Sequence, residues 1–120
     1  MKKILIFAIS IISITGLNAQ WTQLNPGTNA SFQDICVSPT DNNYIFVAGG
    51  DKMYKSTDEG DSWTEMNQSL TTTLWGISFP TNSIGYVCSN DGYVLKTTDG
   101  GNSWSISLQI STGGFRQGIL

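Results

Sequence analysis

Residues 97–104, TTDGGNSW, decide the fold because they recur in altered form earlier in the chain. The earlier copy, residues 56–63, reads STDEGDSW and lies 41 residues upstream. Both copies place a hydroxyl residue, Asp, Gly, Ser and Trp at the same offsets, while the residues between them differ. A repeat must be recognised first, since it determines how every strand is assigned.

The similarity between the two copies extends over a unit of about 41 residues. Residues 32–67 align with residues 74–108 once one residue is skipped between Ile35 and Pro39. Residues 21–25 resemble residues 63–67, the end of a unit, and residues 115–120 resemble the opening of another. The matched pairs are Ile35 with Ile77, Pro39 with Pro80, Thr40 with Thr81, Lys55 with Lys96, Asp58 with Asp99, Gly60 with Gly101 and Trp63 with Trp104.

Each unit contains four short stretches of strand-forming residues separated by turn residues. The expected strands are 32–37, 44–48, 52–56 and 62–66 in the first unit and 74–79, 84–88, 93–97 and 103–108 in the second. A repeat of about 40 to 45 residues with four antiparallel strands is typical of a β-propeller blade. The sequence therefore predicts an all-β fold of two complete blades.

The N-terminal segment, residues 1–19, has the layout of a secretory signal peptide. Two lysines precede an apolar run from Ile4 to Ile14, and a polar stretch ends at the small residue Ala19. A membrane anchor is the alternative, but eleven residues at about 1.5 Å each reach only about half of a 30 Å hydrocarbon core. We expect export to the periplasm, the cell surface or the medium, with no stable membrane span after cleavage.

The rest of the chain divides into four parts. These are residues 20–31, the last strand of a preceding blade and a linker; 32–67, blade 1; 68–108, blade 2; and 109–120, the start of a third blade, cut short. Propellers typically close with about four to eight blades, and repeat stacks need about three or more units. We therefore expect a fragment of a longer propeller. Assembly of several copies into a ring is the alternative, which the sequence neither supports nor excludes.

The composition narrows the class of partner. The chain carries a net charge of −3, and without residues 1–19 four basic residues face nine acidic ones. An acidic surface repels phosphate backbones and anionic lipids, which disfavours nucleic-acid and membrane-surface binding. The glycine pairs 49–50 and 100–101 introduce no helix that could cradle a phosphate. The expected partner is a protein or a glycan, and no cofactor is expected.

The two cysteines, Cys36 and Cys88, could form a disulfide in an exported protein. Their positions in the repeat do not coincide, however, so free thiols within strands are favoured. The chain has no histidine, so a nucleophilic cysteine would lack the usual general base.

STDEGDSW and TTDGGNSW resemble the BNR repeat, or Asp-box: Ser or Thr, any residue, Asp, any residue, Gly, two variable positions, Trp. Residues 79–104 look most like repeats of the photosystem II stability and assembly factor family, and the resemblance covers nearly all of residues 21–108. It implies a propeller in which the motif forms a turn on the blade periphery. It implies little about activity, because Asp-boxes occur in sialidases, other glycosidases, sorting receptors and assembly factors alike.

The residues shared by the two copies suit a turn without any ligand. A carboxylate at Asp58 or Asp99 can accept hydrogen bonds from turn amides. Gly60 and Gly101 supply the positive φ that other residues adopt only at a cost, and each tryptophan can fold back over the hairpin. We predict a structural role for Ser56, Asp58, Gly60, Trp63, Thr97, Asp99, Gly101 and Trp104.

Calcium binding by Asp58, Glu59 and Asp61 is the alternative reading of the first copy. Calcium takes about six to eight oxygen ligands. The second copy has Gly100 and Asn102 at the two variable positions, which removes two charges. We therefore expect no metal site at either copy.

A sialidase-like glycoside hydrolase is the enzymatic alternative that the resemblance implies. That family binds its substrate carboxylate with three arginines, whereas Arg116 is the only arginine here. Its tyrosine nucleophile cannot be placed, because the four tyrosines are expected in strands: Tyr44, Tyr54, Tyr86 and Tyr93.

The remaining acids do not suggest a catalytic pair. Asp41, Asp51 and Asp91 are expected in turns, and Glu65 at an exposed strand position. Asp34 is the candidate hardest to dismiss, because it lies in an expected first strand, which lines the central channel of a propeller; its matched residue is Gly76.

The aromatic residues Trp75 and Phe115 begin matched first strands, where they could pack in the core or stack on a sugar or a protein; core packing is favoured. The sequence favours an exported, non-catalytic scaffold over the N-terminal part of a secreted hydrolase whose catalytic residues lie in further blades.

Overall fold

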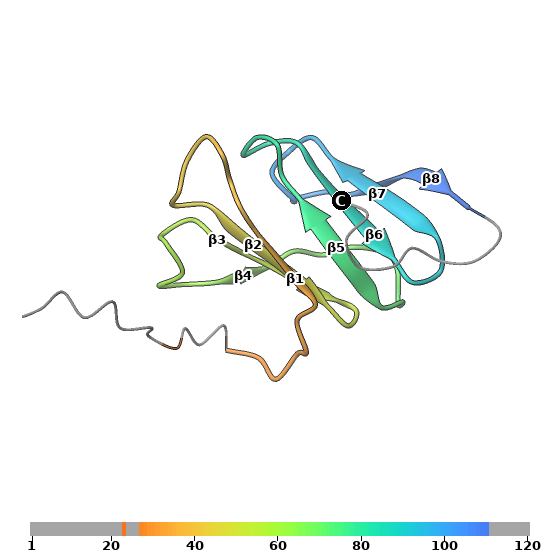
Figure 1. Ribbon diagram of the computed structural model, residues 1–120, viewed down its shortest axis with the longest axis horizontal. Coiled ribbons are helices and arrows are strands. Elements are labelled where there is room, and N and C mark those ends of the chain that lie inside the picture. The colour runs from red at the N-terminus through yellow and green to blue at the C-terminus, as the bar shows by residue number, and fades with distance from the viewer. Residues whose placement is uncertain (1–22, 24–26, 111–120) are drawn as a thin grey trace, which may run out of the picture.

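The computed structural model describes residue 23 and residues 27–110. The expected signal peptide, residues 20–22 and 24–26, and residues 111–120 with Phe115 and Arg116 lie outside the described residues. The described chain forms eight strands and no helix, so it holds no helix long and apolar enough to span a membrane (Figure 1). The predicted all-β class is confirmed.

The strands form two antiparallel four-stranded sheets, each a meander in chain order. Sheet 1 contains β1 (Asp34–Val37), β2 (Ile45–Gly49), β3 (Lys52–Ser56) and β4 (Thr64–Glu65). Sheet 2 contains β5 (Leu74–Ser78), β6 (Gly85–Ser89), β7 (Tyr93–Thr97) and β8 (Ser105–Gln109). Two consecutive four-stranded meanders are two consecutive propeller blades.

The fourth strands are shorter than expected from the sequence. β4 contains two residues, and Trp63 and Trp104 precede β4 and β8 instead of beginning them. The fourth strands begin late because the backbone N–H groups of Ser62 and Ser103 still donate to the turn carboxylates, Asp58 and Asp99. Tyr44, also expected in a strand, lies just before β2, and its N–H donates to the Asp41 carbonyl at 3.0 Å.

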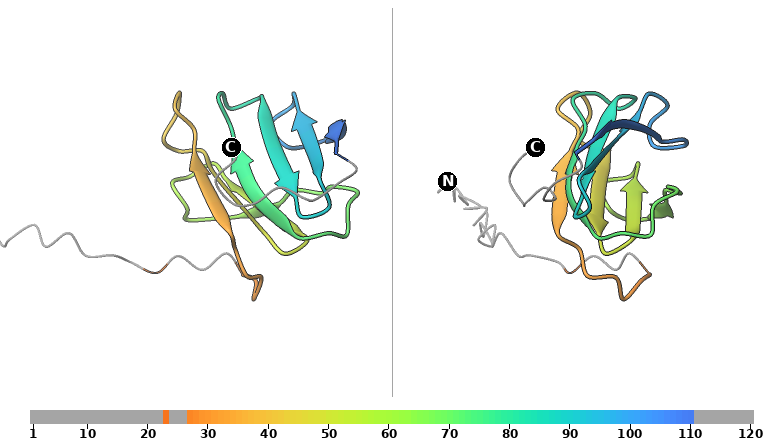
Figure 2. Two further views of the ribbon diagram at one scale, coloured as in Figure 1. Left: turned by 45° about the vertical axis from the view of Figure 1, so that its right-hand side comes forward. Right: turned by 90° about the vertical axis from the view of Figure 1, so that its right-hand side faces the viewer.

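Sheet 2 packs against one face of sheet 1, with β5 beside β1 and β2 (Figures 1 and 2). The N–H of Leu74 donates to the Gly50 carbonyl at 2.7 Å and joins the two sheets directly. The buried core lies between the sheets and comprises Phe46, Ala48, Met53, Met66, Leu74, Ile77, Phe79, Val87 and Leu95. Blade-to-blade burial is therefore the main hydrophobic contribution to stability.

The register shows which residues of the two sheets are equivalent. Cys36 lies opposite Phe46 in sheet 1, as Ser78 lies opposite Tyr86 in sheet 2. Val37 and Phe79 therefore occupy the same position, and the residue skipped in the alignment is Ser38. The Ser38 side chain is buried and hydrogen bonds to Asn82 of the next blade.

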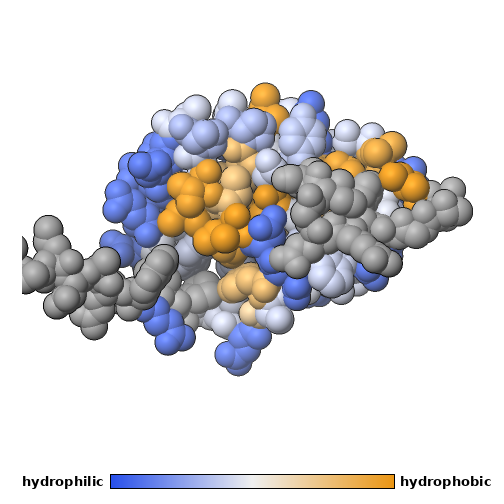
Figure 3. Space-filling view, viewed as in Figure 1, coloured by the Kyte–Doolittle hydropathy of each residue, from blue (hydrophilic) through white to orange (hydrophobic). Residues whose placement is uncertain are grey.

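Large apolar side chains remain exposed at two places, over β1 and along β8 (Figure 3). They are Ile35, Val37, Ile106, Leu108 and Ile110. β1 is the inner strand of the first sheet, and β8 is the outer strand of the second. At both places, the packing of one blade against the other leaves apolar side chains exposed.

Candidate functional site

In the first box, residues 56–63, the Asp58 carboxylate closes the turn between β3 and β4. Its Oδ1 accepts from the Ser62 N–H at 2.8 Å and from the Ser56 hydroxyl at 2.7 Å, and its Oδ2 accepts from the Ser62 hydroxyl at 2.5 Å. Ser56 Oγ accepts from the buried N–H of Gly60 at 2.8 Å. The indole N–H of Trp63 donates to the Gly60 carbonyl at 2.9 Å, which folds the ring back over the turn.

The second box, residues 97–104, repeats this network. Asp99 Oδ1 accepts from the Ser103 N–H at 2.9 Å and from the Thr97 hydroxyl at 2.8 Å, and Oδ2 accepts from the Ser103 hydroxyl at 2.5 Å. The N–H of Gly101 donates to Thr97 Oγ1 at 2.9 Å, and the Trp104 indole donates to the Gly101 carbonyl at 3.2 Å. One bonding pattern therefore serves both hairpins.

These hydrogen bonds favour the charged form of both aspartates. The hydroxyl of Ser103, then its N–H and the Thr97 hydroxyl, lower the pKa of Asp99 to about 2. The hydroxyl and N–H of Ser62 lower the pKa of Asp58 in the same way. A carboxylate held ionised by three donors accepts hydrogen bonds and transfers no proton near neutral pH.

The two boxes differ at the positions that a metal would use. Glu59 has a φ of 59°, in the left-handed region that its counterpart Gly100 occupies at 68°. Asn102, the counterpart of Asp61, donates from its amide to the Asp99 carbonyl at 2.9 Å. Within residues 27–110, no group of three or more Cys, Asp or Glu side chains is placed to hold a metal ion. The structural role of the box residues remains a prediction, supported by this geometry.

Asp34 joins the inner strands of the two sheets. Its Oδ2 accepts from the N–H of Ile77 in β5 at 2.9 Å, and its Oδ1 accepts from the N–H of Ile35 at 2.9 Å. Sequence reasoning placed Asp34 in the first strand but missed this contact. Because both oxygens hold backbone amides, the carboxylate positions β5 on β1.

Trp75 lies at the start of β5, at the same end of the inner strands as Asp34. Its ring is half-buried and is not part of the core between the sheets, contrary to the favoured expectation. The indole N–H donates to Asn90 Oδ1 at 3.1 Å, which holds the ring against the β6–β7 turn. We call Asp34, Trp75 and Asn90 the inner-strand end. Asn90 was missed, although an amide beside Asp91-Gly92 signals a turn.

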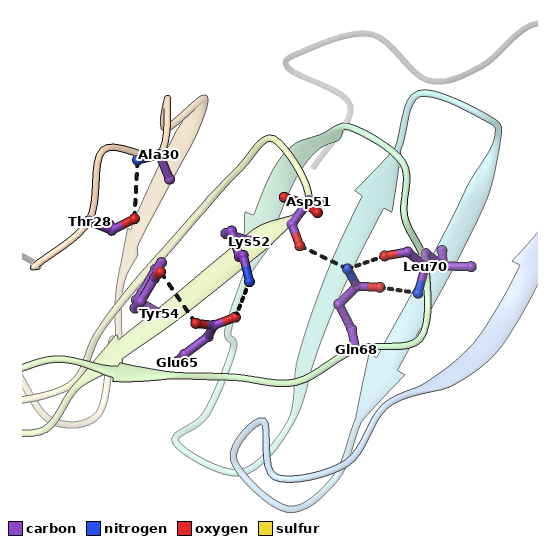
Figure 4. A network of polar contacts seen from close by, with 8 residues as sticks. All are labelled: Thr28, Ala30, Asp51, Lys52, Tyr54, Glu65, Gln68 and Leu70. Atoms are coloured by element: carbon purple, nitrogen blue, oxygen red, sulfur yellow. Dashed lines mark hydrogen bonds and ion pairs between the residues drawn. The ribbon is translucent and has the colours of Figure 1, made fainter.

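The outer strands β3 and β4 carry a separate polar network (Figure 4). Lys52 Nζ lies 2.6 Å from Glu65 Oε1, and the buried Tyr54 donates from its hydroxyl to Glu65 Oε2 at 3.4 Å. The hydrogen bond and charge of Glu65 raise the pKa of Lys52. A tyrosine beside a carboxylate is the pairing that a sialidase-like site needs, but this pair lies on β3 and β4 and not on the inner strands β1 and β5. It supports the hairpin.

Cys36 and Cys88 are free thiols, and the disulfide alternative is not formed. Cys88 is buried in β6, and burial raises the pKa of its thiol. Cys36 lies on β1, and its Sγ accepts from the N–H of Phe79 at 3.3 Å, a contact between the sheets. Both cysteines act as packing residues.

Residues 7–115 match the family model of the DUF6242 beta propeller domain. No curated protein matches. Two similar solved structures are YCF48 bound to a D1 peptide, with 25% identity and a TM-score of 0.62 over 72% of this chain and 29% of that one, and YCF48 from Cyanidioschyzon merolae, with 25% identity and a TM-score of 0.64 over 75% and 27%.

A third structure, an ancestral GH74 enzyme, has 20% identity and a TM-score of 0.57 over 69% of this chain and 13% of that one. This likeness shows the fold alone. The chain spans less than a third of the length of each of these structures. The matches to YCF48 confirm the resemblance to propellers of the assembly-factor kind.

Proposed function

Because the chain belongs to the DUF6242 beta propeller domain family, we propose that it is part of an exported, non-catalytic BNR-type propeller that serves as a binding scaffold for another protein. The observation that carries the proposal is its likeness to YCF48, whose structure contains a bound D1 peptide. Export rests on the signal-peptide layout of residues 1–19. The chain covers 29% of one YCF48 structure and 27% of the other, which supports a whole protein with further propeller blades.

The inner-strand end is the surface that suits a peptide. Trp75 offers an aromatic face fixed by Asn90, and tryptophan is over-represented among residues that dominate binding energy. A ring held before binding loses little conformational freedom when a ligand arrives. The acidic surface of the domain favours a neutral or basic peptide.

A library of random peptides displayed on phage, selected against the purified chain, tests the proposal. We expect selected peptides whose affinity, measured by fluorescence anisotropy, falls about 30-fold in Trp75→Ala, the loss typical of a dominant aromatic contact. Thr71→Ala, at an exposed position preceding the same strand, serves as the control and leaves affinity unchanged. Failure to select any peptide, or peptides indifferent to Trp75→Ala, would contradict the proposal.

A secreted, sialidase-like glycoside hydrolase with its catalytic residues in further blades is the second candidate. The GH74 likeness favours it only at the level of the fold. Within the described residues, both oxygens of Asp34 hold amides, and Glu65 pairs with Lys52. We expect no reducing-sugar release from a panel of polysaccharides and sialosides by the longest natural form of the protein. Release of reducing sugar in proportion to the amount of purified protein would favour the hydrolase.

A further inference from the structure

Trp75 occupies a β-bulge at the start of β5. Leu74 lies opposite Ser89 and Gly76 lies opposite Cys88, which leaves Trp75 as an extra residue in the strand. β1, the equivalent strand of sheet 1, pairs with β2 without such a shift. Bulges re-aim a side chain from the regular alternation of a strand and are over-represented next to functional sites. The bulge therefore accounts for the position of the Trp75 ring outside the core between the sheets.

The Trp75 ring is fixed through its edge. The indole N–H donates to Asn90 Oδ1 at 3.1 Å, and the N–H of Asn90 donates to the Thr73 carbonyl at 2.7 Å. The β6–β7 turn is thus bonded both to the ring and to the segment that precedes it. Across residues 27–110, no other aromatic ring stacks on Trp75 and no lysine lies over it. This half-buried ring is held in place and has no cation of its own.

Three segments that meet near Trp75 each carry a carboxylate. They are β1, the β2–β3 turn and the β6–β7 turn, with Asp34, Asp51 and Asp91. Asp34 bonds to β5 two residues beyond Trp75, and the residue before Asp51 accepts from the N–H of Leu74 at 2.7 Å. Asp91 is exposed and directly follows Asn90, the residue that holds the ring. The surroundings of the ring are therefore acidic.

The three lysines of residues 27–110 are engaged elsewhere. Their partners are Glu65 for Lys52, the Gly100 carbonyl for Lys55 and the Tyr86 ring for Lys96. Glu65 and, to a smaller extent, Asp51 raise the pKa of Lys52, so the charge of Asp51 is partly balanced. Asp91 is the carboxylate whose effect on a bound cation is simplest to test. A cation that a partner brings to Trp75 is attracted by the charge around it.

We propose that Trp75 binds an arginine side chain of the partner peptide, with the guanidinium group stacked on the indole ring and attracted by Asp34 and Asp91. The face of a tryptophan ring attracts cations more strongly than that of tyrosine or phenylalanine. Arginine fits better than lysine, because its planar group stacks on aromatic rings and is more weakly hydrated. This inference rests on the proposed peptide binding and specifies the group that the peptide presents.

An NMR titration of the tryptophan indole N–H signals tests the site directly on the purified chain. The probe is N-acetyl-arginine methylamide, and N-acetyl-citrulline methylamide is the matched neutral control of the same shape. We expect the arginine probe to shift the Trp75 signal, identified by its loss in Trp75→Phe, and the citrulline probe to bind about 5- to 30-fold more weakly. The indole signals of Trp63 and Trp104, which lie in the boxes, are internal controls and should not shift.

Two variants separate the charge from the position of the ring. Asp91→Asn should weaken binding of the arginine probe about 3-fold and leave the citrulline probe unaffected, because it removes a charge and keeps the shape. Asn90→Ala releases the ring without removing it and should weaken binding of both probes. Thr71→Ala, at an exposed position, is the control and should bind as the wild type does. If Asn90→Ala does not fold, Asn90→Asp keeps the acceptor, adds a charge and should bind the arginine probe more tightly.

An arginine probe that binds no more tightly than the citrulline probe, or that leaves the Trp75 signal unshifted, would overturn the inference. If displayed peptides are still selected and depend on Trp75, the scaffold proposal stands and only the cation assignment fails. If the arginine probe binds at Trp75 but no peptide is selected, the cation site is supported and the scaffold proposal fails.

Discussion

The rings of Phe46 and Phe79 stack across the boundary between the two sheets, with centroids 3.5 Å apart and planes 2° from parallel. Phe79 also meets Trp104 edge to face, at 5.9 Å and 89°. This aromatic column links the core of blade 1 to the second box. Its apolar area and its position at the centre of the molecule make it the main contact between the blades.

Phe79→Ala should therefore cost about 3 to 5 kcal/mol of unfolding free energy, the range for large aromatic truncations in a core. The measurement is urea unfolding followed by tryptophan fluorescence. Truncating Tyr86, a half-buried aromatic in β6 that is not part of the core between the sheets, is the control and should cost clearly less. Equal losses for the two variants would show that the stack does not hold the blades together.

Gly85 takes the strand position that Ile45 occupies in blade 1, because the Phe79 ring fills the space beside it. An added Cβ at Gly85 would come within 2.5 Å of two ring carbons of Phe79. Gly85→Ala should cost about 1 to 3 kcal/mol, as overpacking in a core does. In a Phe79→Ala background the same substitution should cost much less, and additive losses in this double-mutant cycle would contradict the contact.

Glu59 and Gly100 adopt the same left-handed backbone, which a glycine adopts freely and a glutamate only at a cost of about 1 to 2 kcal/mol. Glu59→Gly should leave the free energy of unfolding unchanged or raise it by up to about 1 kcal/mol. Glycine removes the cost of the left-handed backbone in the folded state, but it also makes the unfolded chain more flexible, which offsets part of the gain. Gly100→Ala should lower it by about 1 kcal/mol or more. Thermal unfolding of both variants measures the contrast; a clear loss in Glu59→Gly would indicate a role for the carboxylate.

Acidic pH should destabilise the turn formed by the second box, residues 97–104. Asp99 has a pKa of about 2 in the folded protein, below the ordinary value of about 3.9 expected when unfolded. A carboxylate with a lowered pKa contributes stability that is fully present above the unfolded pKa and is lost as pH falls toward the folded pKa. The melting temperature should therefore fall between about pH 4 and pH 2, and less steeply in Asp99→Asn.

Asp51→Asn, at an exposed turn position, controls for the change in net charge. The melting temperature of this variant should fall between about pH 4 and pH 2 as steeply as that of the wild type. If both asparagine variants flatten the pH dependence equally, general charge repulsion and not the box accounts for it.

The blade fold could be predicted because the repeat occurs twice and its turns are marked by glycine. β3 and β7 matched their expected bounds, since each lies between a glycine turn and a box. The fourth strands did not match, because strand-forming side chains such as those of Trp63 and Trp104 are drawn into the turn by hydrogen bonds to glycine carbonyls. Local propensity does not reveal that competition.

At the boxes, the sequence identified the aspartates but missed the role of the hydroxyls. Ser56 and Thr97 accept from the buried Gly60 and Gly101 amides, so the first motif residue is an acceptor as well as a donor. Contacts between sheets, such as Asp34 with Ile77, depend on how two blades lie against each other, which a repeat does not encode. Within blade 2, Gly85 carried a signal of this kind, since a glycine within a strand indicates close approach, here of the Phe79 ring.

Hydrogen exchange at the Gly60 and Gly101 amides, measured by NMR with and without Ca²⁺, tests whether the two boxes are equivalent structural turns. Calcium at about 5 mM exceeds the dissociation constants of weak extracellular sites, about 10⁻³ M. We predict that both amides are protected to a similar degree, that Ser56→Ala and Thr97→Val each abolish protection in their own box, and that calcium changes neither. Protection of Gly60 that appears only with calcium would contradict this and make the first box a metal site.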